Sequence, residues 1–136
     1  MRTIVLSVGR LRPPFADDIQ HYQKLLARHA RLELLELSEE EKVEGRIPER
    51  AFVVLLDSSG RTFDSVGFSK FLEERRQSRQ DLCFVVGGPR GLVTVPNCDL
   101  RLSLGPMTLP HQLARVVLLE QLYRAHKILA GEPYHY

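Results

Sequence analysis

Three short segments of the chain are almost wholly apolar, and they restrict the fold more than any other feature. They cover residues 2–8, 51–57 and 81–86. A strand that is apolar on both faces must be covered on both sides, which is typical of parallel sheets. The sequence therefore predicts an α/β fold, with a mostly parallel sheet and helices on both of its faces.

The segments between and after these runs have helical spacing or are short strands. Helices are expected at residues 15–30, 65–77 and 111–130, and further strands at 32–37 and 100–104. The connection over 38–50 is polar and rich in Glu. We expect the strand over 51–57 to end at Asp57, because Asp57-Ser-Ser-Gly60 has the composition of a turn.

The length of the chain bounds its organisation. Its 136 residues suit one domain over 1–136 with a single core. No stretch approaches the ~20 apolar residues of a membrane span, and the opening segment lacks a signal-peptide core. Cys83 and Cys98 do not have the spacing of a redox or metal pair. We expect a cytoplasmic protein that does not bind a membrane.

Charge is distributed unevenly along the chain, although the net charge is only +2. Residues 1–31 contain six Lys or Arg and two Asp, whereas the middle of the chain is acidic. A positive surface favours a polyanion such as nucleic acid. Charge blocks are also common on ordinary solvated faces, so this pattern alone identifies no partner.

Three of the expected strand ends carry unusual loops, at residues 55–57, 86–89 and 104–111. Ligands of open α/β sheets bind at the carboxyl ends of strands, so these loops are expected to line one pocket. Gly87 and Gly88 allow the backbone to approach a flat ligand of adenosine size. A Gly-Gly-Pro sequence by itself is more often only a tight turn, and the pattern is neither a dinucleotide fingerprint nor a phosphate-binding P-loop.

The expected helix over 111–130 is apolar around most of its circumference. Only one side of it can face the sheet, so the second side is expected to contact another copy in a two-fold homodimer. Glu120 and Arg124 are four residues apart and also suit an ordinary helix pair. The five His lack metal-ligand spacing, and no nucleophile motif occurs. We expect neither a metal nor covalent catalysis.

Five motifs occur together in the second half of the chain. They are Val85-Val-Gly-Gly-Pro-Arg-Gly91, Leu102-Ser-Leu-Gly-Pro-Met-Thr-Leu-Pro-His111, Arg115-Val116, Glu120-Gln-Leu-Tyr-Arg-Ala125 and Pro133-Tyr-His135. Their combination closely resembles the RlmH family of SPOUT-class methyltransferases, which use S-adenosylmethionine to methylate N3 of a pseudouridine in 23S ribosomal RNA. The resemblance implies a SPOUT fold with a C-terminal trefoil knot, an exception to the rule against threaded chains.

The resemblance also implies roles for particular residues. The cofactor-binding set would be Leu56, Gly87, Leu104, Gly105, Pro106, Met107, Thr108 and Leu109, and the catalytic set would be Arg124, Tyr134 and His135. The helix over 111–130 would form the homodimer interface, so that one subunit's cofactor faces the partner's catalytic residues. Our hypothesis is that Arg124 stabilises the anion left when the N3 proton departs, while His135 removes or relays that proton.

Two features depart from the family pattern. The connection over 38–50 is shorter than the Lys/Glu-rich helical segment that the family usually has there, so a full helix is not expected. Many relatives end in a basic residue where this chain ends in Tyr136, which removes one candidate phosphate contact. Two alternatives stay open: a non-catalytic RNA-binding or ribosome-assembly module of the same fold, and a methyltransferase that acts on transfer RNA.

Overall fold

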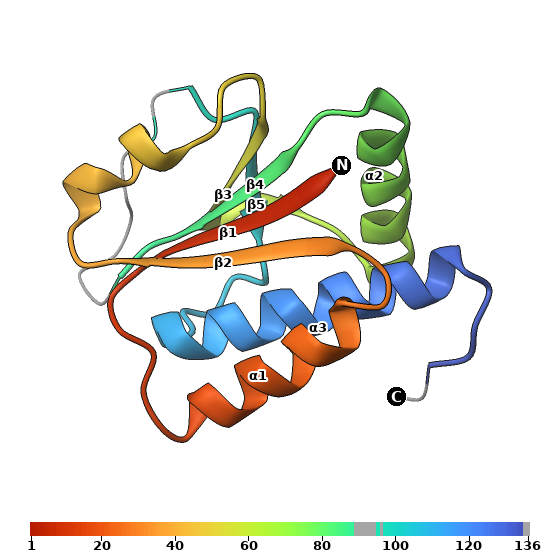
Figure 1. Ribbon diagram of the computed structural model, residues 1–136, viewed down its shortest axis with the longest axis horizontal. Helices are drawn as coiled ribbons and strands as arrows, with labels where there is room; N and C mark the ends of the chain where they lie inside the picture. Colours follow the sequence, from red (N-terminus) through yellow and green to blue (C-terminus); the bar gives the residue numbers. More distant parts are fainter. Residues whose placement is uncertain (89–94, 96, 135–136) are drawn as a thin grey trace.

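The computed structural model describes residues 1–88, 95 and 97–134. In this part of the chain five strands form one sheet in the order β2-β1-β4-β3-β5, and every neighbouring pair is parallel (Figure 1). The strands are β1 (Arg2–Val8), β2 (Arg31–Leu37), β3 (Phe52–Thr62), β4 (Leu82–Val86) and β5 (Leu100–Ser103). The helices are α1 (Phe15–Leu26), α2 (Ser65–Ser78) and α3 (His111–Leu129), with two short 3₁₀ helices, η1 (Glu40–Lys42) and η2 (Glu44–Arg46). The expected parallel sheet is confirmed.

Most element boundaries agree with the sequence to within one residue, and α1 is one of the two exceptions. It ends at Leu26 rather than at residue 30. The N–H groups of His29 and Ala30 both donate to the Leu26 carbonyl, at 2.9 Å each, so the chain turns here towards β2.

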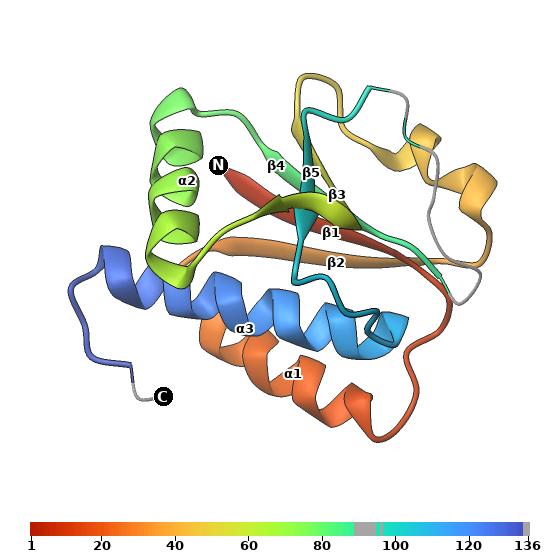
Figure 2. The ribbon, with the colours of Figure 1, turned by 180° about the vertical axis from the view of Figure 1, so that it is seen from behind.

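All three α-helices cover one face of the sheet. Ile19 of α1, Leu72 of α2 and Leu118 of α3 belong to one buried cluster with Val5 and Phe84 of the sheet. Figure 2 shows α1 and α3 side by side beneath the strands. Helix α2 contacts α3 near the C-terminal end of α3. This layer contains most of the buried aliphatic and aromatic side chains of the described residues.

In the described ranges, the second face of the sheet is covered without an α-helix. Val43, between η1 and η2, is 1% exposed and packs with Ile4, Leu6 and Val85. The expectation of helices on both faces is therefore only partly correct, since the helical elements described on this face are two 3₁₀ turns and not α-helices. Part of the connection over 38–50 is needed to leave β2 and to enter β3. The residues that remain are fewer than the ~11 of an average α-helix.

Strand β3 extends five residues past the predicted end at Asp57. Its pairing with β5 shifts register, so that Leu56 and Arg61 both lie opposite Leu102. A Cβ on Gly60 would lie 2.5 Å from the Arg101 carbonyl oxygen, so only glycine allows this approach. The predicted end of the strand at Asp57 was wrong, because the sequence Asp57-Ser-Ser-Gly60 suits a β-bulge as well as a turn.

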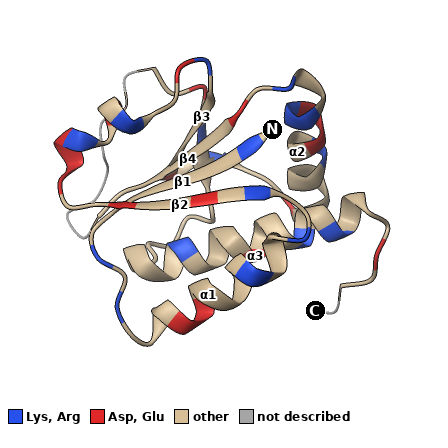
Figure 3. Cartoon of the chain, in the orientation of Figure 1, with Lys and Arg blue, Asp and Glu red and all other residues tan. Residues whose placement is uncertain are grey.

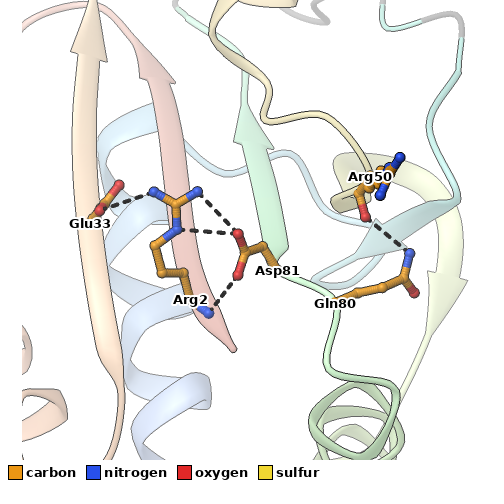
Figure 4. Close-up of polar contacts among 5 residues, drawn as sticks. All are labelled: Arg2, Glu33, Arg50, Gln80 and Asp81. Carbon is orange, nitrogen blue, oxygen red and sulfur yellow. Dashed lines mark hydrogen bonds and ion pairs between the residues drawn. The ribbon is translucent and has the colours of Figure 1, made fainter.

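The amino-terminal edge of the sheet is tied together by Arg2 (Figure 4). Its backbone N–H and its Nη2 donate to Asp81 at 2.9 and 3.0 Å, and its Nη1 lies 3.4 Å from Glu33. Gln80 donates from Nε2 to the Arg50 carbonyl oxygen at 3.1 Å. These contacts join the starts of β1 and β4 to β2 and to the segment before β3.

Helix α3 is covered by its own chain more completely than the sequence predicts. It packs against the sheet and also contacts both α1 and α2 (Figure 1). Leu118, Leu119 and Leu122 are almost fully buried, whereas Leu113 and Val117 stay half-buried. The apolar circumference of α3 is thus explained partly within one chain, and the homodimer stays a prediction. Within the described ranges, no helix is long and apolar enough to cross a membrane.

His126, near the C-terminal end of α3, is a buried histidine with 5% of its surface exposed. Its ring stacks on that of His29, with 5.9 Å between centroids. Burial lowers the pKa of His126 to about 4, and the charges of His29 and Arg76 act in the same direction. The folded protein therefore holds a neutral imidazole here at pH values where an exposed histidine is already charged.

We predict that His126 makes the protein less stable as the pH falls from 6.5 towards 4. The unfolded chain, with an ordinary histidine pKa, binds a proton in this range while the folded chain does not, so acid favours unfolding by up to about 3 kcal/mol. Urea unfolding at pH 7.5 and 4.5 measures the effect in the wild type and in His126→Leu. The variant should lose less stability between the two pH values, and equal losses would contradict the prediction.

Candidate cofactor and substrate site

A cavity of about 180 Å³ opens at the carboxyl ends of β4 and β5, beside the middle of β3 where its register shifts. The three strand-end segments singled out in the sequence all contribute to its walls. The predicted cofactor-binding residues that line it are Leu56, Gly87, Leu104, Gly105, Met107, Thr108 and Leu109. Pro106 is the member of the predicted set that does not line the cavity. The structure thus brings together side chains and backbone that are up to 53 residues apart in the sequence.

Further wall residues are outside the predicted cofactor-binding set, although Asp57, Val86, Gly88 and His111 lie in the segments that the sequence predicts to line one pocket. The further wall residues are Asp57, Ser58, Val86, Gly88, Leu102, His111 and Ala114. Most of them adjoin a predicted residue at the same strand end, and this adjacency was the available signal. Burial lowers the pKa of His111, and the charges of Arg115 and Arg12 lower it further. This wall therefore presents an uncharged imidazole at neutral pH.

The loop after β5 owes its shape to Gly105 and Ser103. Gly105 has φ +133°, a backbone conformation that L side chains rarely adopt. Ser103 Oγ accepts from the Gly105 N–H at 3.0 Å and lies 3.0 Å from the Ser58 carbonyl oxygen. One hydroxyl therefore joins the loop of residues 104–109 to the bulge of β3.

The backbone of this loop is available to a ligand. Within residues 1–88, 95 and 97–134, the N–H groups of Met107, Thr108 and Leu109 find no acceptor. The opposite walls are apolar, from Val86 and Leu102. Free backbone donors beside apolar surface fit a flat heteroaromatic ring, which stacks on the apolar wall and accepts at its ring nitrogens. The residues present thus suit the adenine of an adenosine cofactor.

Asp57 fixes the bulge beside Leu56. Its Oδ1 accepts from the Ser59 N–H at 2.9 Å and from the Ser59 hydroxyl at 2.8 Å, and its Oδ2 accepts from Arg101 Nη1 at 3.0 Å. The hydrogen bonds from the Ser59 backbone, the Ser59 hydroxyl and Arg101 lower the pKa of this carboxyl group. Asp57 is therefore ionised at neutral pH and holds one wall of the cavity in place.

A second polar cluster centres on Glu120 in the middle of α3 and includes Arg124 and Tyr134. Arg124 Nη2 donates to Glu120 Oε2 at 2.7 Å, so the expected helix pair is present. The Tyr134 hydroxyl donates to the same oxygen at 2.8 Å, and the Arg124 guanidinium lies 4.3 Å from the centroid of the Tyr134 ring. Two of the three predicted catalytic residues are thus brought together. His135 lies outside the described residues, as does Tyr136.

Glu120 was not predicted as a site residue. The spacing to Arg124 was visible in the sequence, but the contact with Tyr134 depends on how the chain turns back after α3. Burial raises the pKa of Tyr134, and the hydrogen bond to Glu120 and the charge of Glu120 raise it further. Tyr134 therefore keeps its proton at neutral pH, which suits a donor and a stacking surface rather than a general base.

The predicted catalytic residues that the structure describes, Arg124 and Tyr134, do not line the cavity. Ala114 is the cavity-lining residue of α3 nearest to Arg124, which follows it by 10 residues, or about 15 Å along the helix axis. In the part of the chain that the structure describes, no group of His, Cys, Asp and Glu is arranged to hold a metal ion.

Comparison with known proteins gives a consistent result. A family model described as a predicted SPOUT methyltransferase matches residues 1–135. The ribosomal RNA large subunit methyltransferase H of Gemmatimonas aurantiaca is 40% identical over 153 aligned positions, which cover 99% of each chain. The protein of the same name from Streptococcus pneumoniae is 40% identical over 158 positions, with the same coverage. Both alignments exceed 136 residues, so each relative has residues that this chain lacks.

We predict that Gly105→Ala weakens binding of S-adenosylmethionine by about 10-fold or more, because a side chain at this φ costs about 1–3 kcal/mol and shifts the loop of residues 104–109. Gly131→Ala is a matched control, since Gly131 also has a positive φ, of +68°, but follows α3. Calorimetric titration compares the two variants. Equal affinities would show that the loop conformation does not matter for the cofactor.

Proposed function

Since this chain belongs to the RlmH family of SPOUT ribosomal RNA methyltransferases, we propose that it methylates N3 of a pseudouridine in 23S ribosomal RNA. Membership in this family implies the use of S-adenosylmethionine. The observation that carries the proposal is the cavity at the strand ends, whose walls contain all but one of the predicted cofactor-binding residues. The ribosome itself is the proposed substrate particle.

The cofactor would be held by Leu56, Gly87 and the loop of residues 104–109. S-adenosylmethionine, when bound, supplies a methyl group on a positively charged sulfur. The apolar walls exclude water, and the free N–H groups of Met107, Thr108 and Leu109 orient the adenine. Because the methyl group is already activated, positioning of the attacking nitrogen accounts for most of the rate.

The substrate side would be formed by Arg124, Tyr134 and His135. The N3 proton must leave before or as the nitrogen forms its bond to the methyl carbon, and the uracil ring then carries the electron pair. Arg124 stabilises this negative charge. Since Tyr134 keeps its own proton, His135 is the residue proposed to accept the N3 proton. Glu120 positions Arg124 and Tyr134 by accepting from both.

The separation of the two clusters supports a homodimer. Arg124 lies about 15 Å along α3 from Ala114, the nearest cavity-lining residue of that helix, and in the proposed dimer a second copy brings an Arg124 to each cavity. Leu113 and Val117, half-buried on α3, are apolar surface that such an interface would cover. Each proposed active site thus combines the cofactor cavity of one subunit with Arg124 and Tyr134 of the other.

We also propose the finer features of the family for this chain. These are a trefoil knot in its C-terminal part, a single domain over 1–136 and a cytoplasmic location alongside ribosomes. Family membership supports the knot, as does the strand order, in which β5 follows β4 in the chain but pairs with β3 instead.

The proposed reaction is tested by mass mapping of 23S ribosomal RNA from a strain that lacks the gene. We expect one pseudouridine to lose a single methyl group, and the purified protein to restore it on ribosomes. If ribosomal RNA is unchanged while the protein still binds S-adenosylmethionine, the chain is a non-catalytic module. If a transfer RNA loses the methyl group instead, 23S ribosomal RNA is not the substrate.

We predict that Arg124→Ala lowers the methylation rate by about 100-fold or more, because the ring anion loses its charged donor. Binding of S-adenosylmethionine should stay at the wild-type level, since Arg124 lies far from the cavity of its own chain. Lys127→Ala is the control, because Lys127 stands one turn further along and pairs with Glu132 at 2.8 Å. A wild-type rate in Arg124→Ala would remove Arg124 from the mechanism.

A further inference from the structure

The loop between β1 and α1, residues 9–14, is held against the N-terminal end of α3. Arg115 of α3 is only 4% exposed. Its Nη2 donates to the carbonyl oxygens of Val8 at 2.8 Å and Gly9 at 2.9 Å. Figure 1 shows the chain leaving β1 and passing the end of α3 before it enters α1. The base of the loop is therefore fixed by a buried cation.

The middle of the loop is fixed as well. The Gln112 side chain accepts from the Arg12 N–H at 2.8 Å and donates to the Arg10 carbonyl oxygen at 3.0 Å. The Leu11 N–H donates to Glu36 Oε1 at 3.1 Å. Three consecutive residues thus have their backbone bound to side chains from α3 and β2, which gives the loop one defined conformation.

The side chains of Arg10 and Arg12 project from this fixed backbone into solvent. Both residues are exposed, and neither guanidinium has an ion-pair partner in residues 1–88, 95 and 97–134. The loop contains no acidic residue, and Figure 3 shows the basic colour along it. Two arginines held on a rigid backbone favour an anionic partner, because little conformational freedom is lost when it binds.

The loop borders the proposed cofactor cavity. A Cβ on Gly88, a wall residue, would lie 3.0 Å from Val8 Cγ1 at the base of the loop. Arg12 is also close enough to His111, another wall residue, for its charge to act on the imidazole. Any RNA that presents a nucleotide to the cavity therefore passes within reach of these arginines.

We propose that residues 9–14 form a phosphate-binding surface for ribosomal RNA, with Arg10 and Arg12 on phosphates that flank the methylated nucleotide. This inference rests on the proposed function. The net charge of +2 gives little overall attraction for RNA, so local positive surfaces must orient it. Guanidinium groups suit this role because they bind phosphate oxygens with two parallel hydrogen bonds. The contacts orient the substrate and carry no sequence preference of their own.

The test compares Arg10→Gln/Arg12→Gln with a control that removes the same charge elsewhere. Arg31 and Arg50 are exposed and lie at the opposite, amino-terminal edge of the sheet, where Figure 4 shows Arg50. Arg31→Gln/Arg50→Gln is therefore the matched control. Equilibrium binding to ribosomes is measured over a range of salt concentrations, with methylation kinetics and S-adenosylmethionine affinity measured separately.

We expect the loop variant to bind ribosomes on the order of 10-fold more weakly than the control, and its log–log salt slope to be shallower by about 1 to 2. The KM for ribosomes should rise, while kcat at saturation and cofactor affinity stay near the control values. Loop and control variants with equal affinity and equal salt slope would overturn the inference. If the wild type binds ribosomes but methylates none, the proposed function fails. The comparison of ribosome binding then still tests whether Arg10 and Arg12 contact RNA phosphates.

Discussion

The arrangement of the molecule depends on one buried cation, Arg115. Burying a charge is costly unless it is hydrogen-bonded. Arg115 Nη2 binds the carbonyl groups at the end of β1 and Nη1 lies 3.7 Å from Glu36, whereas Nε has no hydrogen-bond partner among the described residues. Helix α3 cannot slide along the sheet without leaving the guanidinium unbonded. The position of α3 in turn sets the wall of the cavity at His111 and the conformation of the loop over residues 9–14.

The proposed site combines two copies of the chain because the cavity and the Glu120 cluster are set apart on α3. The cavity is lined by His111 and Ala114 in the first turn of the helix, whereas Glu120 and Arg124 follow further along it. Packing of α3 by both α1 and α2 holds the two sets of residues in these positions. In the proposed arrangement, each cavity obtains its substrate-side residues from the partner subunit.

Much of the fold was predictable from the sequence, because apolar runs and helical spacing reflect burial directly. The strand ends that line the cavity were also visible, since Gly87 and Gly105 mark irregular backbone there. Other features depend on long-range packing. The extension of β3 requires Arg101 to lie beside Gly60, and the role of Glu120 requires Tyr134 to fold back onto α3. Among the described residues, the connection over 38–50 contributes only 3₁₀ turns to the second sheet face, because part of it is needed to leave β2 and to enter β3.

The central claim, that each active site is shared between two subunits, is tested most directly with mixed dimers. One chain carries Arg124→Ala and the other Gly105→Ala, with different affinity tags so that only the mixed dimer is isolated. At a cofactor concentration that fills the intact cavity but not the Gly105→Ala cavity, a shared site predicts about half the wild-type methylation rate, because one of the two sites then combines an intact cavity with an intact Arg124. A mixed dimer as inactive as the Arg124→Ala parent would contradict the account.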